Sequence, residues 1–422
     1  MIKRLISLVY VSSLLAACGG SSGSSSDSEP ALTSKSALGE VLFSDVNLSF
    51  ERTQSCATCH NPQHGFVDDR SNDASTGGLT SPVSLGDNGT SLGDRNAPTA
   101  AYAAFSPDFQ QGTRERVASQ KTSGIGDYNG YLGGQFWDGR SIDLTAQAGG
   151  PPTNPIEMGM PNKAAVVERL RENSRYINAF EVLYGADVFN DVDTAYEAMA
   201  DSIAAFEEQN KAQFYPFDSK YDGSLTGEYQ YEPGTPAALG RALFFSSDFS
   251  CAACHQLRPL SDKGEIFTSF EYHNIGVPEN TALRAINGET SVDKGLANNS
   301  AVPDAEKAVQ EGKFKVPTLR NTAVTAPYMH NGVFNELETV MLFYEHAKKR
   351  GQNQADNSLN PETGLPWRTP EIDKNISHGL LGGNDIVIDD VRAKAFSCFM
   401  LTLTDAKYEY LLDPQKVTEC GI

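Results

Sequence analysis

Two copies of the pentad Cys-x-x-Cys-His constrain this chain of 422 residues more than any other feature. They read CATCH at 56–60 and CAACH at 251–255. This spacing is typical of c-type haem attachment, in which two thioethers fix the porphyrin edge and the histidine becomes the proximal iron ligand. The sequence therefore predicts two covalently bound c-type haems. The residues expected to hold them are Cys56, Cys59, His60, Cys251, Cys254 and His255.

The cysteines and histidines of this chain also allow uses other than haem attachment. A zinc site built from both Cys-x-x-Cys pairs has suitable spacing, but it gives the histidine after each pair no role. We expect His64, four residues after His60, to take a surface or hydrogen-bonding position. Cys398 and Cys420 could pair in an oxidising compartment, which the sequence leaves open.

An internal repeat accompanies the pentads. Residues 37–60 and 238–255 both carry Ala-Leu-Gly-x-x-Leu-Phe, then a polar stretch, then the pentad. Each copy predicts an amphipathic helix that leads into a haem loop, so the same unit occurs twice. Strand signals are sparse, and we expect a mainly α fold of two cytochrome c-like domains with long loops.

Further helices and loops are expected between and after the repeats. Helices are predicted at about 162–183, 193–209 and 390–404, the last of them beginning at acidic residues suited to a helix N-terminus. Glycine-rich segments at 71–98, 121–134 and 351–385 show little periodicity and are expected to be loops. The segment 106–134 carries no readable motif, and an ordinary surface insertion is favoured over a docking surface.

The N-terminus predicts export. Residues 1–17 have two basic residues, an apolar run too short to span a membrane and then small residues, as in a signal peptide. The ending Leu-Ala-Ala-Cys resembles a bacterial lipoprotein cleavage box, in which Cys18 is lipidated; a plain signal peptide with an accidental cysteine is the alternative. Residues 18–35 form a Gly/Ser-rich tether. We therefore expect a periplasmic, membrane-anchored lipoprotein.

Charge and length bound the rest. A formal net charge of −20 argues against binding nucleic acid or an anionic membrane surface through charge. After the tether, we expect one domain at 36–225 and another at 226–422, with the boundary in the Tyr/Pro/Gly-rich stretch 215–236.

Beyond the pentads, the chain resembles the bacterial di-haem cytochrome c peroxidases and their MauG-like relatives over nearly all of its mature sequence. Three further blocks carry the resemblance. They are RNAPT at 95–99, QFWDGR at 135–140 with GPPTNPIEMG at 150–159, and KVPTLRNTAVTAPYMHNG at 315–332.

The resemblance implies a peroxide-reacting haem in the N-terminal domain. Trp137 would lie between the two haems as an electron relay. Gln147, Pro151 and Glu157 would line the open side of the first haem, where Glu157 moves protons as the O–O bond breaks. Taken alone, a single Glu is most often at the surface and a lone Trp most often in the core.

Two further sites are carried over in the same way. The resemblance implies a calcium ion between the domains, surrounded by Asn96, Thr325 and Pro327. Peroxidases of the family often cap the first iron with a histidine in the loop before the RN motif. Here that loop has no histidine, and Asn88 falls near the expected place, so we expect an open first haem.

The sixth ligand of the second iron decides between branches of the family. The peroxidases carry a methionine seventeen residues after the proline of the TAPY motif, and this count from Pro327 reaches Tyr344, the ligand type of the MauG-like branch. A tyrosine oxygen favours ferric and higher states, whereas a thioether favours Fe(II). The rival donors are Met329, His330, Met341 and His346.

The favoured hypothesis is a MauG-like enzyme that reacts with H2O2 and uses a high-valent di-haem state to oxidise a residue, expected to be tryptophan, of a partner protein. The alternative is a cytochrome c peroxidase that reduces H2O2 with electrons from a small cytochrome or copper protein. A two-haem electron carrier is disfavoured by Gln147 and Glu157 and by the missing distal histidine.

Overall fold

The computed structural model describes only part of the chain. The described residues are 31–70, 82–121, 125–259, 264–381 and 386–422. The predicted signal peptide, Cys18 and most of the predicted tether lie outside them. Residues 32–422 form one compact unit, to which the following description is limited. In the described ranges, no helix has the length and apolar character needed to cross a bilayer.

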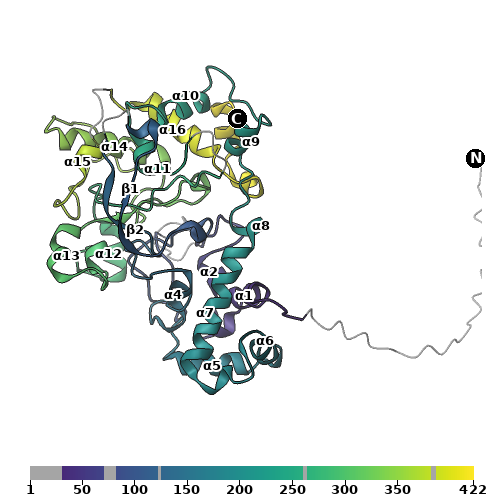
Figure 1. The fold of residues 1–422 in the computed structure, drawn as a ribbon. Coiled ribbons are helices and arrows are strands. Elements are labelled where there is room, and N and C mark those ends of the chain that lie inside the picture. Colours follow the sequence, from purple (N-terminus) through teal and green to yellow (C-terminus); the bar gives the residue numbers. More distant parts are fainter. Residues whose placement is uncertain (1–30, 71–81, 122–124, 260–263, 382–385) are drawn as a thin grey trace, which may run out of the picture. The chain divides into compact units, whose positions relative to one another are not determined.

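Helices dominate this unit, as the sequence predicts (Figure 1). In the first half they are α1 (Lys35–Phe43), α2 (Cys56–Cys59), α3 (Ala118–Lys121), α4 (Leu144–Ala148), α5 (Lys163–Arg171), α6 (Ser174–Tyr184), α7 (Val192–Gln209) and α8 (Lys211–Phe214). In the second half they are α9 (Lys220–Thr226), α10 (Pro236–Phe244), α11 (Cys251–His255), α12 (Thr281–Asn287), α13 (Asp304–Gln310), α14 (Leu337–Gly351), α15 (His378–Leu381), α16 (Asp390–Leu401) and α17 (Pro414–Cys420).

The described strands form two small antiparallel pairs. Strand β1 (Gln110–Arg114) pairs with β2 (Tyr128–Leu132), and β3 (Tyr272–His273) pairs with β4 (Phe314–Lys315). The prediction of a loop over 121–134 is therefore wrong at β2. The glycines of this segment led to the wrong prediction, because Gly130 pairs with Gly112 of β1 in the middle of the strand pair.

Two of the three further helix predictions are confirmed. Helix α7 matches the predicted 193–209, and α16 begins at Asp390 after its N-cap Asp389, whose carboxylate accepts a hydrogen bond from the Arg392 backbone. The single helix predicted over 162–183 is wrong. The chain breaks at Asn173, which caps a new helix, α6, by accepting a hydrogen bond from the Arg175 backbone.

The repeated glycine explains why each repeat helix crosses a second helix so closely (Figure 1). A Cβ atom added to Gly39 of α1 would lie 1.8 Å from the carbonyl oxygen of Ser202 in α7. A Cβ added to Gly240 of α10 would lie 1.9 Å from the carbonyl oxygen of Ala395 in α16. The sequence repeat is therefore a structural repeat, in which glycine lets two helix backbones touch.

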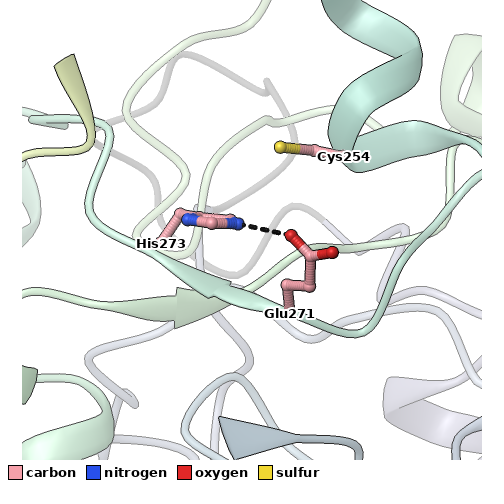
Figure 2. Close-up of side chains that lie close together, drawn as sticks. All are labelled: Cys254, Glu271 and His273. Atoms are coloured by element: carbon pink, nitrogen blue, oxygen red, sulfur yellow. Dashed lines mark hydrogen bonds and ion pairs between the residues drawn. The ribbon is translucent and has the colours of Figure 1, made fainter. Parts of the chain in front are cut away.

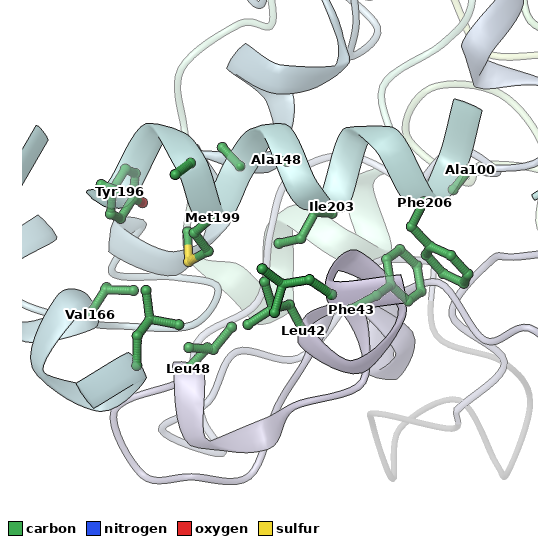
Figure 3. Packing of buried hydrophobic residues seen from close by; sticks show 14 of the residues in the cluster. Leu42, Phe43, Leu48, Ala100, Ala148, Val166, Tyr196, Met199, Ile203 and Phe206 are labelled. Carbon is green, nitrogen blue, oxygen red and sulfur yellow. The ribbon is translucent and has the colours of Figure 1, made fainter. Parts of the chain in front are cut away.

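Each crossing builds its own core. Figure 3 shows the first core, in which Leu42 and Phe43 of α1 lie beside Ile203 and Phe206 of α7. The Phe43 and Phe206 ring centroids are 5.6 Å apart in an edge-to-face contact. The second core packs Phe244 of α10 against Phe396 and Phe399 of α16, with ring centroids of Phe244 and Phe399 5.1 Å apart.

The two remaining cysteines of the described chain form a disulfide. Cys398 of α16 and Cys420 of α17 are bonded, with Cα atoms 5.2 Å apart. This pairing, which the sequence left open, ties the C-terminal helix to the second core's central helix.

Candidate haem sites

Both proximal histidines are held by the same backbone device. His60 Nδ1 lies 3.1 Å from the carbonyl oxygen of Phe66, and His255 Nδ1 lies 3.0 Å from that of Phe267. Phe66 and Phe267 both take a positive φ, 56° and 55°, which is rare outside glycine and turns each carbonyl towards its histidine. With Nδ1 as the donor, Nε2 of each ring keeps its lone pair for a metal.

The protonation of these groups suits haem attachment better than zinc binding. Burial lowers the pKa of His60 and lowers that of His255 to about 4, so both rings are neutral near pH 7. Burial also raises the pKa of the Cys56 and Cys251 thiols to about 12, away from the thiolate that zinc requires. The two pairs also lie apart, since Cys56 packs on the first core and Cys251 on the second.

A cavity beside the second pentad fits a haem. Its wall contains both cysteines and the histidine of that pentad, and most of the remaining wall is apolar. The side chains used below from this second cavity are Trp137, Cys251, Cys254, His255, Phe314, Lys315, Met329, His330, Met341, Tyr344 and Met400.

Tyr344 of α14 is in the wall of the second cavity, and its hydroxyl has no hydrogen-bond partner among the described residues. Burial raises the pKa of this phenol, so in the protein alone the neutral form is favoured. A ferric ion would reverse that balance, because a bound cation stabilises the phenolate. The arrangement provides an oxygen donor facing the same cavity as His255.

The rival donors are separated in part. His346 does not line the second cavity, and its Nδ1 lies 2.8 Å from a carboxylate oxygen of Asp356. Met329 and Met341 do line it, Met341 three residues before Tyr344 on the same helix.

His330 is a wall residue with an unused nitrogen. Its ring stacks on Phe314 with centroids 3.6 Å apart, and burial lowers its pKa to about 3. Its Nε2 atom is buried and has no partner in the part of the chain that the structure describes. Such an orphaned polar atom fits a cavity that a bound group completes.

Two consecutive aromatic residues face the two sites. Trp137 lines the second cavity and donates from Nε1 to the carbonyl oxygen of Asn96 at 2.8 Å. Phe136, with a φ of 64°, lines a separate depression that also holds Glu157. The strained backbone at Phe136 therefore directs the Phe136 ring to the Glu157 depression and the Trp137 ring to the second cavity.

The Glu157 depression lies on the first-pentad side. Burial raises the pKa of the Glu157 carboxyl, and nearby Arg140 opposes that rise. Burial is the main cause that raises the pKa values of Cys56 and Cys59, and the negative charge of Glu157 adds to that rise, as expected for a carboxyl group on the side of the first pentad. A half-buried carboxyl group with a raised pKa can carry a proton between two oxygen atoms.

Gln147 and Pro151 lie on the segment that leads to Glu157. Gln147 is on α4, and the carbonyl oxygen of Pro151 accepts a hydrogen bond from the Met158 backbone at 3.3 Å. The segment thus folds back on itself and fixes the acid. Asn88, by contrast, is exposed, and its side-chain oxygen caps its own turn at 2.8 Å from the Ser91 nitrogen.

One candidate calcium residue, Asn96, contacts the segment that contains the other two. The Asn96 backbone donates to the carbonyl oxygen of His330 at 2.8 Å, which places Asn96 beside the segment containing Thr325 and the cis Ala326–Pro327 bond. The carbonyl oxygens of Thr325 and Pro327 accept no hydrogen bond among the described residues. Unpaired carbonyl oxygens are ligands that Ca²⁺ accepts.

The insertion at 106–134 is not an ordinary surface insertion, and that prediction is wrong. Arg116 is buried and donates to the carbonyl oxygen of Ala253 at 2.6 Å and to the Glu271 carboxylate at 2.7 Å. Arg114 also lies 3.2 Å from Glu271. The insertion therefore braces the second pentad. No sequence motif revealed this, because the partner is mainly backbone.

Figure 2 shows the groups behind that brace, Cys254, Glu271 and His273. His273 Nε2 lies 2.8 Å from Glu271, and the ligand atoms of all three residues lie within 4.8 Å of one another. Burial lowers the pKa of His273, but Cys254 and Glu271 outweigh it and raise the pKa to about 9. Once Cys254 is a thioether, only Glu271 continues to raise the pKa of His273 against the effect of burial.

Comparison with known proteins agrees with this geometry. Residues 33–230 match the family model described as di-haem cytochrome c peroxidase. Methylamine utilization protein MauG of Paracoccus denitrificans is 44% identical over 94% of this chain and 95% of its own length. Cytochrome c peroxidase Ccp of Escherichia coli is 30% identical over 78% of this chain and 57% of its own length.

A solved structure shares the fold. A variant of the diheme peroxidase BthA from Burkholderia thailandensis superimposes with a TM-score of 0.75 and 26% identity, covering 90% of this chain and 88% of that one. The enzyme class that the family resemblance implies is therefore confirmed, and this chain is a di-haem oxidoreductase that reacts with H2O2. It belongs to the family of di-haem cytochrome c peroxidases that includes MauG.

Proposed function

We propose that this enzyme uses the two oxidising equivalents of H2O2 to oxidise an aromatic residue, in the first place tryptophan, of a partner protein. The observation that carries the proposal is Tyr344, an unpaired phenol in the wall that also holds His255. The bound haems supply the iron that reacts with peroxide. A phenolate ligand there favours oxidised iron, so the second site stores oxidising equivalents rather than accepting electrons.

The other residues have matching roles in the proposal. Glu157 takes a proton from one peroxide oxygen and returns it to the other, and Gln147 and Pro151 shape the space around the peroxide. Trp137 carries electrons between the two sites. The hydrogen bond from Trp137 Nε1 to the Asn96 carbonyl oxygen holds the ring in place, but a carbonyl oxygen does not accept the indole proton permanently.

The alternative function is a cytochrome c peroxidase fed by a small cytochrome or copper protein. Met341 supports it, because this thioether lines the same cavity as Tyr344. A thioether on the second iron would raise its potential and suit electron entry.

Three further features belong to the proposal. We infer a calcium ion held by Asn96, Thr325 and Pro327, supported by the unpaired carbonyl oxygens described above. Two cytochrome c-like domains at 36–225 and 226–422 are supported by the two cores, although Tyr221, before that boundary, packs in the second core. A periplasmic location and a lipid on Cys18 rest on the N-terminal sequence alone.

Peroxide addition to the resting holoprotein tests the main proposal. We expect a long-lived oxidised form by optical and EPR spectroscopy, and slow turnover with reduced cytochrome c. The variant Tyr344→His should bind both haems but lose the long-lived form. Fast turnover with the reduced cytochrome and no long-lived form would support the alternative. Pull-down from the periplasm, with mass spectrometry for oxygen added to tryptophan or tyrosine, would identify the partner.

A further inference from the structure

The chain has two tryptophans, and the second has no role so far. Trp367 and Trp137 are both half-buried, but Trp137 lines the second cavity, whereas Trp367 lies outside that wall on the segment after α14. Its neighbours in sequence and in the local turn, Leu359 and Leu365, are 52% and 60% exposed. Trp367 therefore lies where the second half meets solvent.

Aromatic rings connect Trp367 to the second cavity. The Trp367 and Phe343 centroids are 6.1 Å apart, and the Phe343 and Tyr344 centroids are 6.0 Å apart. Phe334 also packs against Trp367, with ring centroids 6.0 Å apart. The half-buried indole is thus separated from the cavity-lining phenol by one ring, and the His346 ring also stacks on the indole with centroids 5.5 Å apart.

Polar groups on the other side of the indole can take its proton. Trp367 Nε1 donates to Ser358 Oγ at 3.0 Å, and Ser358 Oγ donates to the Asp356 carboxylate at 3.0 Å. Burial raises the pKa of Asp356, but hydrogen bonds from His346 and Ser358 outweigh it and lower the pKa to about 2, so the group is ionised. Trp137 has no such chain, because its Nε1 donates to a carbonyl oxygen.

We propose that Trp367 is a surface redox relay, through which electrons from the partner's aromatic residue enter towards Tyr344 and the second cavity. The inference rests on the proposed function and names the residue at which electrons from the partner enter this protein. It follows from the ring contacts on one side of the indole and the Ser358–Asp356 chain on the other.

The step balances in electrons and protons. One electron passes from the Trp367 indole towards Tyr344, and the Nε1 proton moves to Ser358 while the serine hydroxyl proton moves to Asp356. The neutral indolyl radical then takes one electron and one proton from the aromatic residue of the partner. The proton on Asp356 then passes to water, which frees the carboxylate for a second transfer. Two such transfers take two electrons and two protons from the partner, and one H2O2 consumes two electrons and two protons as it becomes two molecules of water.

The test uses the holoprotein with H2O2 and no partner. In the wild type we expect an organic EPR radical that narrows when tryptophan is ring-deuterated, and mass spectrometry should find oxygen added to Trp367. Trp367→Phe should lose both signals, and its peroxide-oxidised form should persist several-fold longer. The resting optical spectrum should be unchanged, because Trp367 does not line the second cavity and an aromatic ring remains in the packing.

Two further variants separate a redox role from a structural one. Ser358→Ala keeps the indole but removes the proton acceptor, so its radical should retain an exchangeable proton in electron–nuclear double resonance. Tyr410→Phe changes another aromatic residue, 65% exposed, and should behave as wild type. An oxidised form that decays equally fast in wild type and Trp367→Phe, with Trp367 unmodified, overturns this inference alone. If the wild type forms no long-lived oxidised form, the proposed function falls with it.

Discussion

The first and second halves hold their proximal histidines in the same way. They differ in the other reactive side chain that each half provides for its haem site. In both, a glycine lets two helices cross, and a phenylalanine carbonyl at positive φ orients the histidine. The first half has a half-buried carboxyl group, Glu157, and the second has a phenol, Tyr344. The helix crossing and the histidine contact, which the two halves share, therefore allow two chemistries, because they fix only the proximal histidine.

The crossings also align the halves residue by residue. A Cβ on Gly39 would meet Phe206 at 2.9 Å, and a Cβ on Gly240 would meet Phe399 at 3.0 Å. The next residue on each partner helix is therefore equivalent, Glu207 in the first half and Met400 in the second. Since Met400 lines the second cavity, Glu207 is expected to face the first haem, which its effect on the Cys56 pKa supports.

The largest expected effect breaks only the first half. Glu157→Gln should slow the reaction of the holoprotein with H2O2 by about 100-fold or more, as for loss of a general acid–base group. The wild-type rate should rise with pH through the Glu157 pKa, which burial raises above 4.5, whereas the variant should lack that inflection.

Stopped-flow mixing over a range of pH measures this difference. Exposed Glu181→Gln on α6 is the control and should match the wild type. Equal rates for Glu157→Gln and the wild type would remove Glu157 from the proposed chemistry.

The next prediction tests whether the shared helix crossing is equally important in both halves. Glycine to alanine usually stabilises a helix, but Gly39→Ala and Gly240→Ala should each lower the free energy of unfolding by about 1–3 kcal/mol, because the added methyl group meets a carbonyl oxygen.

Thermal and denaturant unfolding would check it. Gly379→Ala on α15 has open space and should be neutral or slightly stabilising. A loss in only one of the two crossing variants would show that the halves are not equivalent.

The smallest expected effect concerns a group that the second half lacks. Burial and the neighbouring Glu208 raise the pKa of Glu207 to about 8. The folded state thus binds this proton more tightly than the unfolded state, so its contribution to stability is full below pH 4.5 and is lost as pH rises through about 8. From pH 5 to pH 7, Glu207→Gln should gain on the order of 1 kcal/mol relative to wild type. A constant difference across that range would contradict the assignment.

The sequence predicted the parts of this molecule that short spacing encodes. The pentads, the repeated glycine helix and the helix behind Asp389 follow from local pattern. The bracing by Arg116 and the proton chain behind Trp367 could not be predicted, because their partners are distant backbone atoms or lie across a turn. The prediction of a single helix over 162–183 was wrong because the N-cap at Asn173 outweighed the apolar periodicity.

The central claim is that Tyr344, rather than a methionine, would hold the second haem iron together with His255. Near-infrared absorption and EPR of the resting holoprotein test it most directly, with Tyr344→Met and Met341→Leu as paired variants. The account predicts no methionine–iron band in the wild type or in Met341→Leu, and the appearance of that band in Tyr344→Met. A methionine–iron band in the wild type that disappears in Met341→Leu would contradict it.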